Sequence, residues 1–409
     1  MHIPSTQKFK FYFVYFSLLI IFIYFALVIC NFFLQRYISK HNESEITQAK
    51  IIERDRTAKE DVLQRKLAIK DGYKPLFYPE TIDNYLPLRK LAIELDVAPL
   101  APQPNSSLYF CNEGYGLIKY KTDRFGFRNS NEQWDKKVDA LLIGDSFTHG
   151  ACVEDKDTIS ANLNDKFNTL NLGTYGNHAI HYAAVEKTFI PIVKPKYVIT
   201  IFYANDNEDD VDSVYWNKSY SDATKYFESS NSYTSLSSKV KDFYTKADYL
   251  IDNLLSGEQS PDDFIKKYSH TGFLEKSLKY FSLPTIRKTF INYAKANGYI
   301  GKLPYSNVVA IDTLITSCQQ NGCIPMVAYI PNSNFWRPDA RATHYSKLLA
   351  EYCKTKGIQF IDTTKLIDDL GDKAFAPKGP HLSPIGYRVV ANALRNNLST
   401  DSSKPTSQH

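Results

Sequence analysis

The chain has 409 residues, of which 43% are hydrophobic and 23% charged, as in ordinary folded proteins, and this excludes a wholly disordered chain. Lys and Arg number 49 and Asp and Glu 44, so the net charge is +5, and no basic block stands out. Electrostatics therefore favour no nucleic-acid partner, and six cysteines are too few for a small disulfide-held scaffold.

The N-terminal segment predicts a membrane anchor. No charged residue occurs from Phe11 to Leu34, and a helix of this length spans about 36 Å, enough for a hydrocarbon core of roughly 30 Å. A cleaved signal peptide is the alternative, but the apolar run is long and no A-x-A site follows it. Lys8 and Lys10 on one side balance Arg36 and Lys40 on the other, so orientation is weakly determined. We expect a single-pass membrane protein with its body on the periplasmic or extracytoplasmic side.

The segments around the core differ in composition. After the anchor, residues 1–40, the polar residues 41–70 lack Pro and Gly and predict a solvated helical stalk. Residues 71–138 contain prolines and short apolar runs, which predict an irregular lead-in. The final residues, 400–409, are predicted to be a disordered tail.

A regular alternation predicts an α/β core formed by residues 139–206 and 305–399. Apolar runs predict five strands, at 139–145, 169–173, 196–204, 324–330 and 358–362. Helix-like stretches occur at 158–167, 178–193, 306–320, 340–356 and 384–398. Strands that alternate with helices indicate parallel βαβ units, and continuously apolar strands indicate a sheet buried on both faces.

Residues 207–304 interrupt the alternation. About 100 residues are too many for a plain loop in a compact domain, so we predict a mostly helical insertion. Two roles remain open, a lid or cap over the substrate site and a packing appendage without contact to it. Its aromatic residues, among them Trp216 and Tyr226, could stack on sugars or form a local core.

Four residues at the ends of predicted strands suit nucleophilic ester chemistry. Ser146 follows the first strand in Gly-Asp-Ser-Phe-Thr-His-Gly, Gly176 the second, Asn205 the third and His381 the fifth. The carboxyl ends of parallel strands meet at one edge of a sheet, so these residues can gather there. Ser146 would be the nucleophile and His381 its general base. The backbone N–H groups of Ser146 and Gly176 and the side-chain amide of Asn205 would form an oxyanion hole. The plainer alternative for Ser146 is a helix N-cap.

These four segments, in this order, resemble the SGNH/GDSL hydrolases, whose letters name the same Ser, Gly, Asn and His. The resemblance covers residues 139–398, with 207–304 as extra sequence. The segment Asp123–Asn129, Asp-Arg-Phe-Gly-Phe-Arg-Asn, also resembles one that precedes the serine block in membrane-anchored bacterial members. The resemblance implies a flavodoxin-like three-layer α/β/α sandwich with a five-stranded parallel sheet, and ester hydrolysis or acyl transfer. No cofactor and no metal ion are predicted.

Two positions depart from the family pattern. Tyr203 stands where the G-x-N-D block has its glycine, and Lys378 stands where the D-x-x-H block has its aspartate. A catalytic histidine needs a partner that fixes its tautomer and stabilises the imidazolium. The candidates are a backbone carbonyl, Asp362 and Asp372. Failing these, the protein would be a slow enzyme or a catalytically silent relative.

Other polar residues have plainer interpretations. His178 and His181 are three positions apart and could share a helix face, but no third ligand lies nearby in sequence, so ordinary helix histidines are predicted. His149 is predicted to lie at the rim of the site. Asp206 is predicted to brace its loop.

The cysteines leave alternatives open. Cys111 and Cys152 flank the first strand and could be bridged if the body faces an oxidising space. Cys318 and Cys323 could form a short-loop disulfide or remain two buried thiols.

The leading hypothesis is a membrane-anchored SGNH-type esterase or O-acyltransferase of the cell envelope. Its substrates would be acyl esters, such as O-acetyl groups on envelope polysaccharide; this substrate follows from the anchor and the resemblance and from no single residue. The alternative is a catalytically silent SGNH-like module that binds glycan or an assembly partner, which Lys378 favours. A lipid esterase at the bilayer surface is a third option, for which the polar insertion offers no apolar groove.

Overall fold

The computed structural model describes two compact units, which comprise Met1–Ile52 with His270–Ile300 and Glu53–Ser269 with Gly301–His409. The residues that the structure describes are 5–41, 63–77, 82, 86–207, 226–229, 232–256, 283–297, 301–334, 336, 339 and 341–400. Most of the predicted stalk and the tail beyond residue 400 therefore lie outside the described residues, and residues 63–70 of the stalk are helical.

The larger unit contains a five-stranded sheet in the order β10-β9-β6-β4-β5, with every neighbouring pair parallel. The strands are β4 (Ala140–Gly144), β5 (Thr169–Asn171), β6 (Tyr197–Tyr203), β9 (Ile324–Ile330) and β10 (Gln359–Asp362). This confirms the predicted five-stranded parallel sheet. Counted in chain order, the strands run 2-1-3-4-5, the flavodoxin-like order, whose ligand crevice lies beside the first strand.

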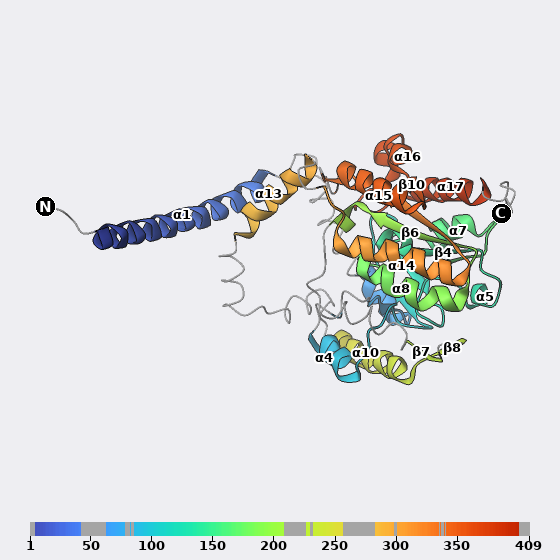
Figure 1. The fold of residues 1–409 in the computed structure, drawn as a ribbon. Helices are drawn as coiled ribbons and strands as arrows, with labels where there is room; N and C mark the ends of the chain where they lie inside the picture. Colours follow the sequence, from blue (N-terminus) through green and yellow to red (C-terminus); the bar gives the residue numbers. More distant parts are fainter. Residues whose placement is uncertain are drawn as a thin grey trace. The chain divides into compact units, whose positions relative to one another are not determined.

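The core helices are α7 (Ile159–Leu163), α8 (Ala179–Val193), α14 (Tyr305–Asn321), α15 (Ala342–Lys356) and α17 (Pro384–Thr400). Their ends lie within two residues of the predicted ones, except that α7 ends at Leu163 and not at residue 167. Figure 1 shows α8 and α14 side by side, and both contact β6. Helices α7 and α17 contact each other, and they reach β5 and β10 respectively. The three-layer arrangement itself stays a prediction.

The sheet is buried because its strands are apolar at successive positions. Leu141, Leu142 and Ile143 of β4 have no exposed surface, as expected for a strand covered on both faces.

One acidic group is buried in the same core. Glu186 of α8 is fully buried and accepts a hydrogen bond from Thr200 Oγ1 at 2.6 Å. Burial raises the pKa of the Glu186 carboxyl to about 8, so this group is protonated at neutral pH.

The lead-in is more ordered than predicted. It forms a three-stranded sheet of β1 (Lys74–Pro75), β2 (Ser107–Tyr109) and β3 (Lys119–Lys121), together with α4 (Leu86–Leu95) and α5 (Asn131–Trp134). Strands this short give little sequence periodicity, which is why the composition indicated irregular structure.

A buried carboxylate organises the end of the lead-in. Asp123 Oδ1 accepts the backbone N–H groups of Phe125 and Phe127 at 2.8 and 3.0 Å. Asp123 Oδ2 accepts Asn129 Nδ2 at 2.9 Å. The Asn129 amide also exchanges two hydrogen bonds with the backbone of Asn171 in β5, at 2.7 and 3.0 Å. The Asp123–Asn129 segment is therefore fastened to the edge of the central sheet.

The insertion is divided between the two units, and its described residues in the larger unit up to Ser256 pack on the lead-in and on α8. These residues form the antiparallel pair β7 (Phe227–Ser229) and β8 (Ser232–Leu236), followed by α10 (Ser238–Ser256), while α13 (Pro284–Ala296) of the insertion belongs to the smaller unit. The ring of Phe227 contacts those of Phe125 and Phe189, and Tyr244 Oη donates to the Ala101 carbonyl at 2.7 Å. The described aromatic residues Tyr226, Phe227, Phe243 and Tyr244 are all buried, so they form local core. Trp216 lies outside the described residues, and the lid role stays a prediction.

The smaller unit consists of α1 (Ser5–His41) and α13 (Pro284–Ala296). Within α1, Tyr12–Leu34 is long and apolar enough to cross a membrane, a test that a signal sequence also passes. The two helices pack together at Asn31, which is fully buried. Its Oδ1 accepts the backbone N–H groups of Thr285 and Ile286 at 3.0 and 3.1 Å. A polar side chain in α1 thus caps the first turn of α13.

Candidate active site

Ser146 begins α6 (Ser146–His149), the short helix that directly follows β4. Asp145 is the N-cap of this helix, and its Oδ1 accepts the Phe147 N–H at 2.9 Å. Because Asp145 performs the capping, the Ser146 hydroxyl is available for another partner, and the N-cap interpretation of Ser146 was wrong. The residue is 8% exposed.

His381 reaches Ser146 although β10 and β4 are not neighbours in the sheet. The chain after β10 forms α16 (Thr364–Asp368) and η4 (Gly371–Ala374) and then folds back on itself. The Ala376 N–H donates to the His381 carbonyl, and the Ser383 N–H donates to the Ala374 carbonyl, both at 2.8 Å. This closed loop brings His381 Nε2 to 3.0 Å from Ser146 Oγ, within the range for a nucleophile and its base.

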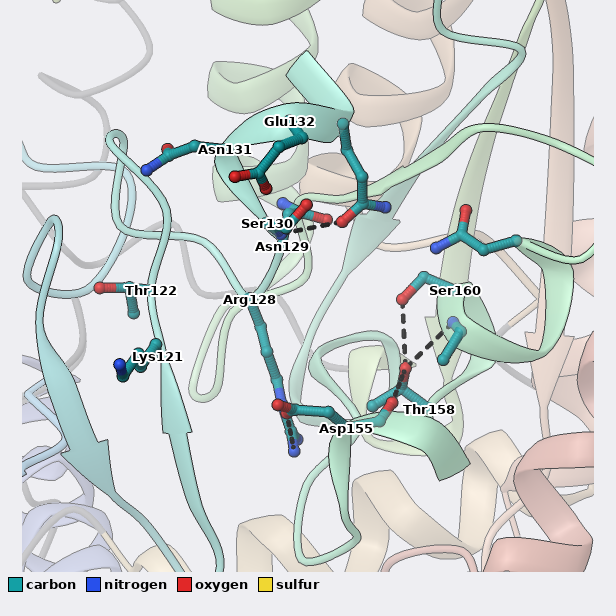
Figure 2. Close-up of a pocket in the computed structure, with 13 residues that line it drawn as sticks. Lys121, Thr122, Arg128, Asn129, Ser130, Asn131, Glu132, Asp155, Thr158 and Ser160 are labelled. Atoms are coloured by element: carbon teal, nitrogen blue, oxygen red, sulfur yellow. Dashed lines mark hydrogen bonds and ion pairs between the residues drawn. The ribbon is translucent and has the colours of Figure 1, made fainter. Parts of the chain in front are cut away.

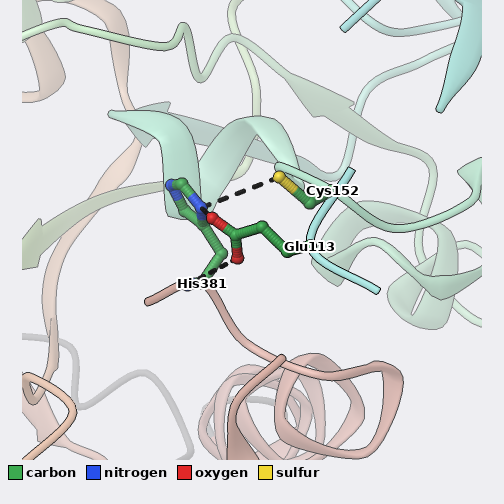
Figure 3. Close-up of side chains that lie close together, drawn as sticks. All are labelled: Glu113, Cys152 and His381. Carbon is green, nitrogen blue, oxygen red and sulfur yellow. Dashed lines mark hydrogen bonds and ion pairs between the residues drawn. The ribbon is translucent and has the colours of Figure 1, made fainter. Parts of the chain in front are cut away.

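The other ring nitrogen of His381 contacts an acid that the sequence analysis did not name. Glu113 Oε1 lies 2.7 Å from His381 Nδ1, and Glu113 Oε2 accepts the His381 backbone N–H at 3.1 Å (Figure 3). The position of the carboxylate depends on Gly379, since a Cβ at that residue would collide with Glu113 Cδ. The bare α-carbon of Gly379 therefore makes room for the acid.

The two predicted histidine partners were wrong. Asp362 accepts hydrogen bonds from Ser346 Oγ and from the Thr364 N–H, and Asp372 is exposed in η4. The contact with His381 Nδ1 that either aspartate would have to make is made by Glu113. This residue belongs to the lead-in, far upstream in the chain. Lys378, at the family's aspartate position, donates its backbone N–H to the Glu113 carbonyl at 3.0 Å.

These contacts fit one tautomer of a neutral imidazole. A proton on Nδ1 is donated to the Glu113 carboxylate, which leaves the Nε2 lone pair facing the Ser146 hydroxyl. The arrangement can pass the hydroxyl proton to Nε2 while the carboxylate stabilises the imidazolium that forms. This is the geometry of a nucleophile, a base and an orienting acid.

Gly176 and Asn205 lie at the ends of the two strands that flank β4. Gly176 follows β5 with φ +75°, a conformation that favours glycine. Asn205 is exposed in η2 (Ala204–Asn207), directly after β6. The next residue, Asp206, is buried and accepts the Tyr203 N–H at 2.9 Å, so it braces this turn. Both residues thus follow strands that are direct neighbours of β4, and their role as oxyanion donors stays a prediction.

Tyr203, which stands where the G-x-N-D block has its glycine, packs against α6. The ring of Tyr203 stacks on that of Phe147, with centroids 3.8 Å apart and planes 23° from parallel. Tyr203 is 2% exposed. This departure from the family pattern therefore has a packing role.

His149 is buried and does not lie at the rim, where it was predicted. Its Nδ1 accepts the Tyr175 N–H at 3.2 Å, its Nε2 lies 2.9 Å from Tyr120 Oη, and its ring stacks on Phe110. Burial lowers the pKa of His149 well below its ordinary value, so it is neutral. His149 fixes the turn that leads into Gly176.

Both cysteine pairs whose bonding the sequence left open are disulfides, Cys111–Cys152 and Cys318–Cys323. The sulfur of Cys152 lies 3.8 Å from His381 Nδ1, and Figure 3 shows it beside the imidazole with Glu113. Potential ligand atoms of Glu113, Cys152 and His381 lie within 4.8 Å of one another. A disulfide sulfur is not a thiolate ligand, and the carboxylate already contacts Nδ1, so these contacts fit a catalytic triad better than a metal site.

The predicted helix histidines sit at the start of α8. His178 donates its backbone N–H to Nδ1 of His181 at 2.8 Å, and His181 is buried. One ring nitrogen of His181 is therefore engaged by the backbone, as in a helix-capping contact.

A polar pocket of about 440 Å³ lies beside the lead-in (Figure 2). Arg128 contacts Asp155 there at 2.7 Å and donates to the carbonyls of Gly150 and Val153 at 2.7 and 2.9 Å. Through these hydrogen bonds the guanidinium stabilises the turn that follows α6. Neither Ser146 nor His381 lines this pocket.

A scan of protein-family models gives no match, and a search of curated proteins gives none either. Several solved structures are similar to this chain, among them the following three. One is a protein assigned to the lipolytic G-D-S-L family from Desulfitobacterium hafniense DCB-2, with 13% identity and a TM-score of 0.34 over 63% of this chain and 98% of that one. Another is a member of the lipolytic G-D-S-L family from Veillonella parvula DSM 2008, with 12% identity and a TM-score of 0.34 over 63% and 96%. The third is LAE5, an alpha/beta hydrolase enzyme from the metagenome of Lake Arreo, Spain, with 14% identity and a TM-score of 0.33 over 64% and 95%. These TM-scores are below 0.5, so the chemistry must be inferred from the site itself.

Glu113 is the functional candidate that sequence reasoning missed. Nothing in the spacing links it to His381, which is 268 positions away. One signal was present. Cys111 is two positions before Glu113, and its pairing with Cys152 would have placed this acid near Ser146.

Proposed function

We propose that the protein is a membrane-anchored serine esterase or O-acyltransferase of SGNH/GDSL type, with the three-layer sandwich typical of that family. Its proposed substrates are acyl esters, such as O-acetyl groups, of cell-envelope glycans. The observation that supports this proposal is the chain of contacts from Ser146 Oγ through His381 to the Glu113 carboxylate, at 3.0 and 2.7 Å.

In this proposal Ser146 Oγ attacks the ester carbonyl carbon while His381 Nε2 takes its proton, and Glu113 stabilises the imidazolium. The N–H groups of Ser146 and Gly176 and the Asn205 amide hold the oxyanion of the tetrahedral intermediate. The imidazolium then protonates the departing alcohol, which leaves an acyl group on Ser146. Water releases the acyl group in hydrolysis, and a sugar hydroxyl accepts it in transfer.

The proposed location is outside the cytoplasm. Helix α1 carries an apolar stretch long enough for a bilayer span, and two disulfides lie in the larger unit. Disulfides persist mainly in oxidising compartments. An anchored body in such a compartment meets envelope glycans, which is the support for this substrate class.

The silent-module alternative was based on Lys378. Its force depended on His381 lacking an acidic partner, and Glu113 lies at hydrogen-bonding distance from Nδ1. The observed contacts therefore favour the enzyme over the silent module.

Serine-directed chemistry tests the proposal. The full-length protein in detergent should react with a fluorophosphonate probe and hydrolyse a small aryl acetate. Ser146→Ala should abolish both, with little change in melting temperature, since the side chain lost is small. Ser317→Ala is the matched control, because Ser317 is similarly buried, at 7% exposure, in α14. Wild-type activity in Ser146→Ala would refute the assignment, and a wild type without labelling or hydrolysis would support the silent module.

A further inference from the structure

The Cys111–Cys152 disulfide joins the loop that carries Glu113, here called the acid loop, to the turn that follows Ser146, here called the turn of the nucleophile. Cys111 precedes Glu113 by two positions, and Cys152 follows Ser146 by six. The two Cα atoms are 5.2 Å apart in the disulfide. The bond therefore connects the acid loop to the turn of the nucleophile without passing through the histidine.

The acid loop is a compact turn whose position follows that of Cys111. Asn112 Oδ1 accepts the N–H groups of Gly114 and Gly116 at 2.9 and 3.1 Å. The Ile118 N–H donates to the Cys111 carbonyl at 3.0 Å and closes the turn. Glu113 lies between these contacts, so a displacement of Cys111 would displace its carboxylate.

The other end of the disulfide is fixed to the turn of the nucleophile. The Ala151 N–H donates to the Ser146 carbonyl at 2.9 Å, and Tyr387 Oη of α17 donates to the Ala151 carbonyl at 3.1 Å. Cys152 has φ +61°, a left-handed conformation that non-glycine residues rarely adopt. Such conformations persist where the surroundings over-determine them and concentrate at functional sites.

The other contacts of Glu113 described above are with the loop that carries His381. They are the hydrogen bonds with His381 and with the Lys378 N–H. Without the disulfide, noncovalent contacts such as that of Phe110 with His149 would still link the acid loop to α6, but the acid and the histidine could shift together relative to Ser146. A misplacement of about 1 Å in a catalytic arrangement can cost about 10²-fold in rate.

From these contacts we infer that Cys111 and Cys152 are positioning residues, whose disulfide holds the Glu113–His381 pair in register with Ser146. This inference rests on the proposed function and deepens it. It makes turnover of the hydrolase dependent on the oxidised state of this one disulfide.

The test compares two double variants of the full-length protein in detergent. Cys111→Ser/Cys152→Ser should lower kcat for an aryl acetate about 10²-fold, with KM within about threefold of wild type. Cys318→Ser/Cys323→Ser is the control, since that disulfide joins the end of α14 to the start of β9. The control variant should keep wild-type kcat. A Cys111→Ser/Cys152→Ser variant with wild-type kcat would overturn the inference.

A double-mutant cycle separates positioning from general stability. In a Glu113→Gln background, removal of the Cys111–Cys152 disulfide should slow fluorophosphonate labelling of Ser146 by no more than about threefold, because the group being positioned is already lost. A purely structural role predicts the same loss in both backgrounds, and that result would overturn the inference.

Reduction of the folded wild type covers the case in which the double variant does not fold. A phosphine reductant, followed by alkylation of the freed thiols, should lower kcat while circular dichroism stays unchanged. Full activity with both thiols alkylated would overturn the inference. An oxidised wild type that shows no Ser146-dependent labelling would refute the proposed function, which is a separate outcome.

Discussion

Replacing Glu113 by Gln tests the triad most directly. The substitution keeps the shape of the side chain but changes one oxygen into a donor. If the amide oxygen faces Nδ1, the NH₂ group faces the His381 backbone N–H, where the carboxylate now accepts a hydrogen bond at 3.1 Å. If the NH₂ group faces Nδ1, at the 2.7 Å contact, the imidazole must carry its proton on Nε2 and can no longer accept the proton of Ser146. Both orientations therefore impair the base.

The expected loss is large and confined to the chemical step. Removal of the acid from a Ser-His-acid triad with its geometry intact lowers kcat about 10⁴-fold, which corresponds to about 5.4 kcal/mol at 1.36 kcal/mol per tenfold. We expect Glu113→Gln to lower kcat about 10³- to 10⁴-fold in aryl acetate hydrolysis, with KM changed less than about threefold. Asp372→Asn is the control, since Asp372 is exposed, and it should keep wild-type kcat. Glu113→Gln activity within about threefold of wild type would show that Glu113 does not serve His381.

Three further predictions follow from other contacts. Lys378→Asp should not raise kcat, because Glu113 already contacts His381 Nδ1. A clear gain over wild type would mean that Glu113 does not perform the role of the family's aspartate. Asn205→Ala should lower kcat on the order of 10²- to 10³-fold, as expected for the loss of one oxyanion donor, and unchanged kcat would remove Asn205 from the site. Burial raises the pKa of Glu186 from an ordinary value of 4.5 to about 8, so the folded protein keeps a proton that the unfolded chain releases. This contribution to stability is complete below pH 4.5 and is lost as the pH rises to about 8. Glu186→Gln should flatten that part of the stability profile in denaturant titrations from pH 5 to 8.5, whereas an unchanged slope would show that Glu186 is ionised in the folded state.

The sheet could be predicted because its information is local. Runs such as Tyr197–Tyr203 are apolar at every position but Thr200, and the turns that follow them carry Gly, Asn, Asp or Ser. Parallel strands share one edge at their carboxyl ends, so the sequence alone predicts that Ser146 and Asn205 lie near each other.

The acid could not be predicted in the same way because its information is not local. Glu113 belongs to a turn between two three-residue strands, too short for a periodic signal. Only the tertiary structure brings the Glu113 carboxylate to His381, and the missing Cβ of Gly379 leaves the space that the carboxylate occupies. The family's D-x-x-H pattern points to aspartates near His381 in sequence, such as Asp362 and Asp372, and not to an acid far upstream.

The order of the triad along the chain has a consequence for biosynthesis. Glu113 and Ser146 are made early and can be joined through the Cys111–Cys152 disulfide, which closes a separation of 41 positions. The base, His381, is separated from Ser146 by 235 positions, and its loop is followed by α17, the last helix of the described chain. A nascent or C-terminally truncated chain therefore carries the serine without its base. Under the proposed mechanism, hydrolytic activity should appear only when synthesis of the whole core is complete and its last helix has docked.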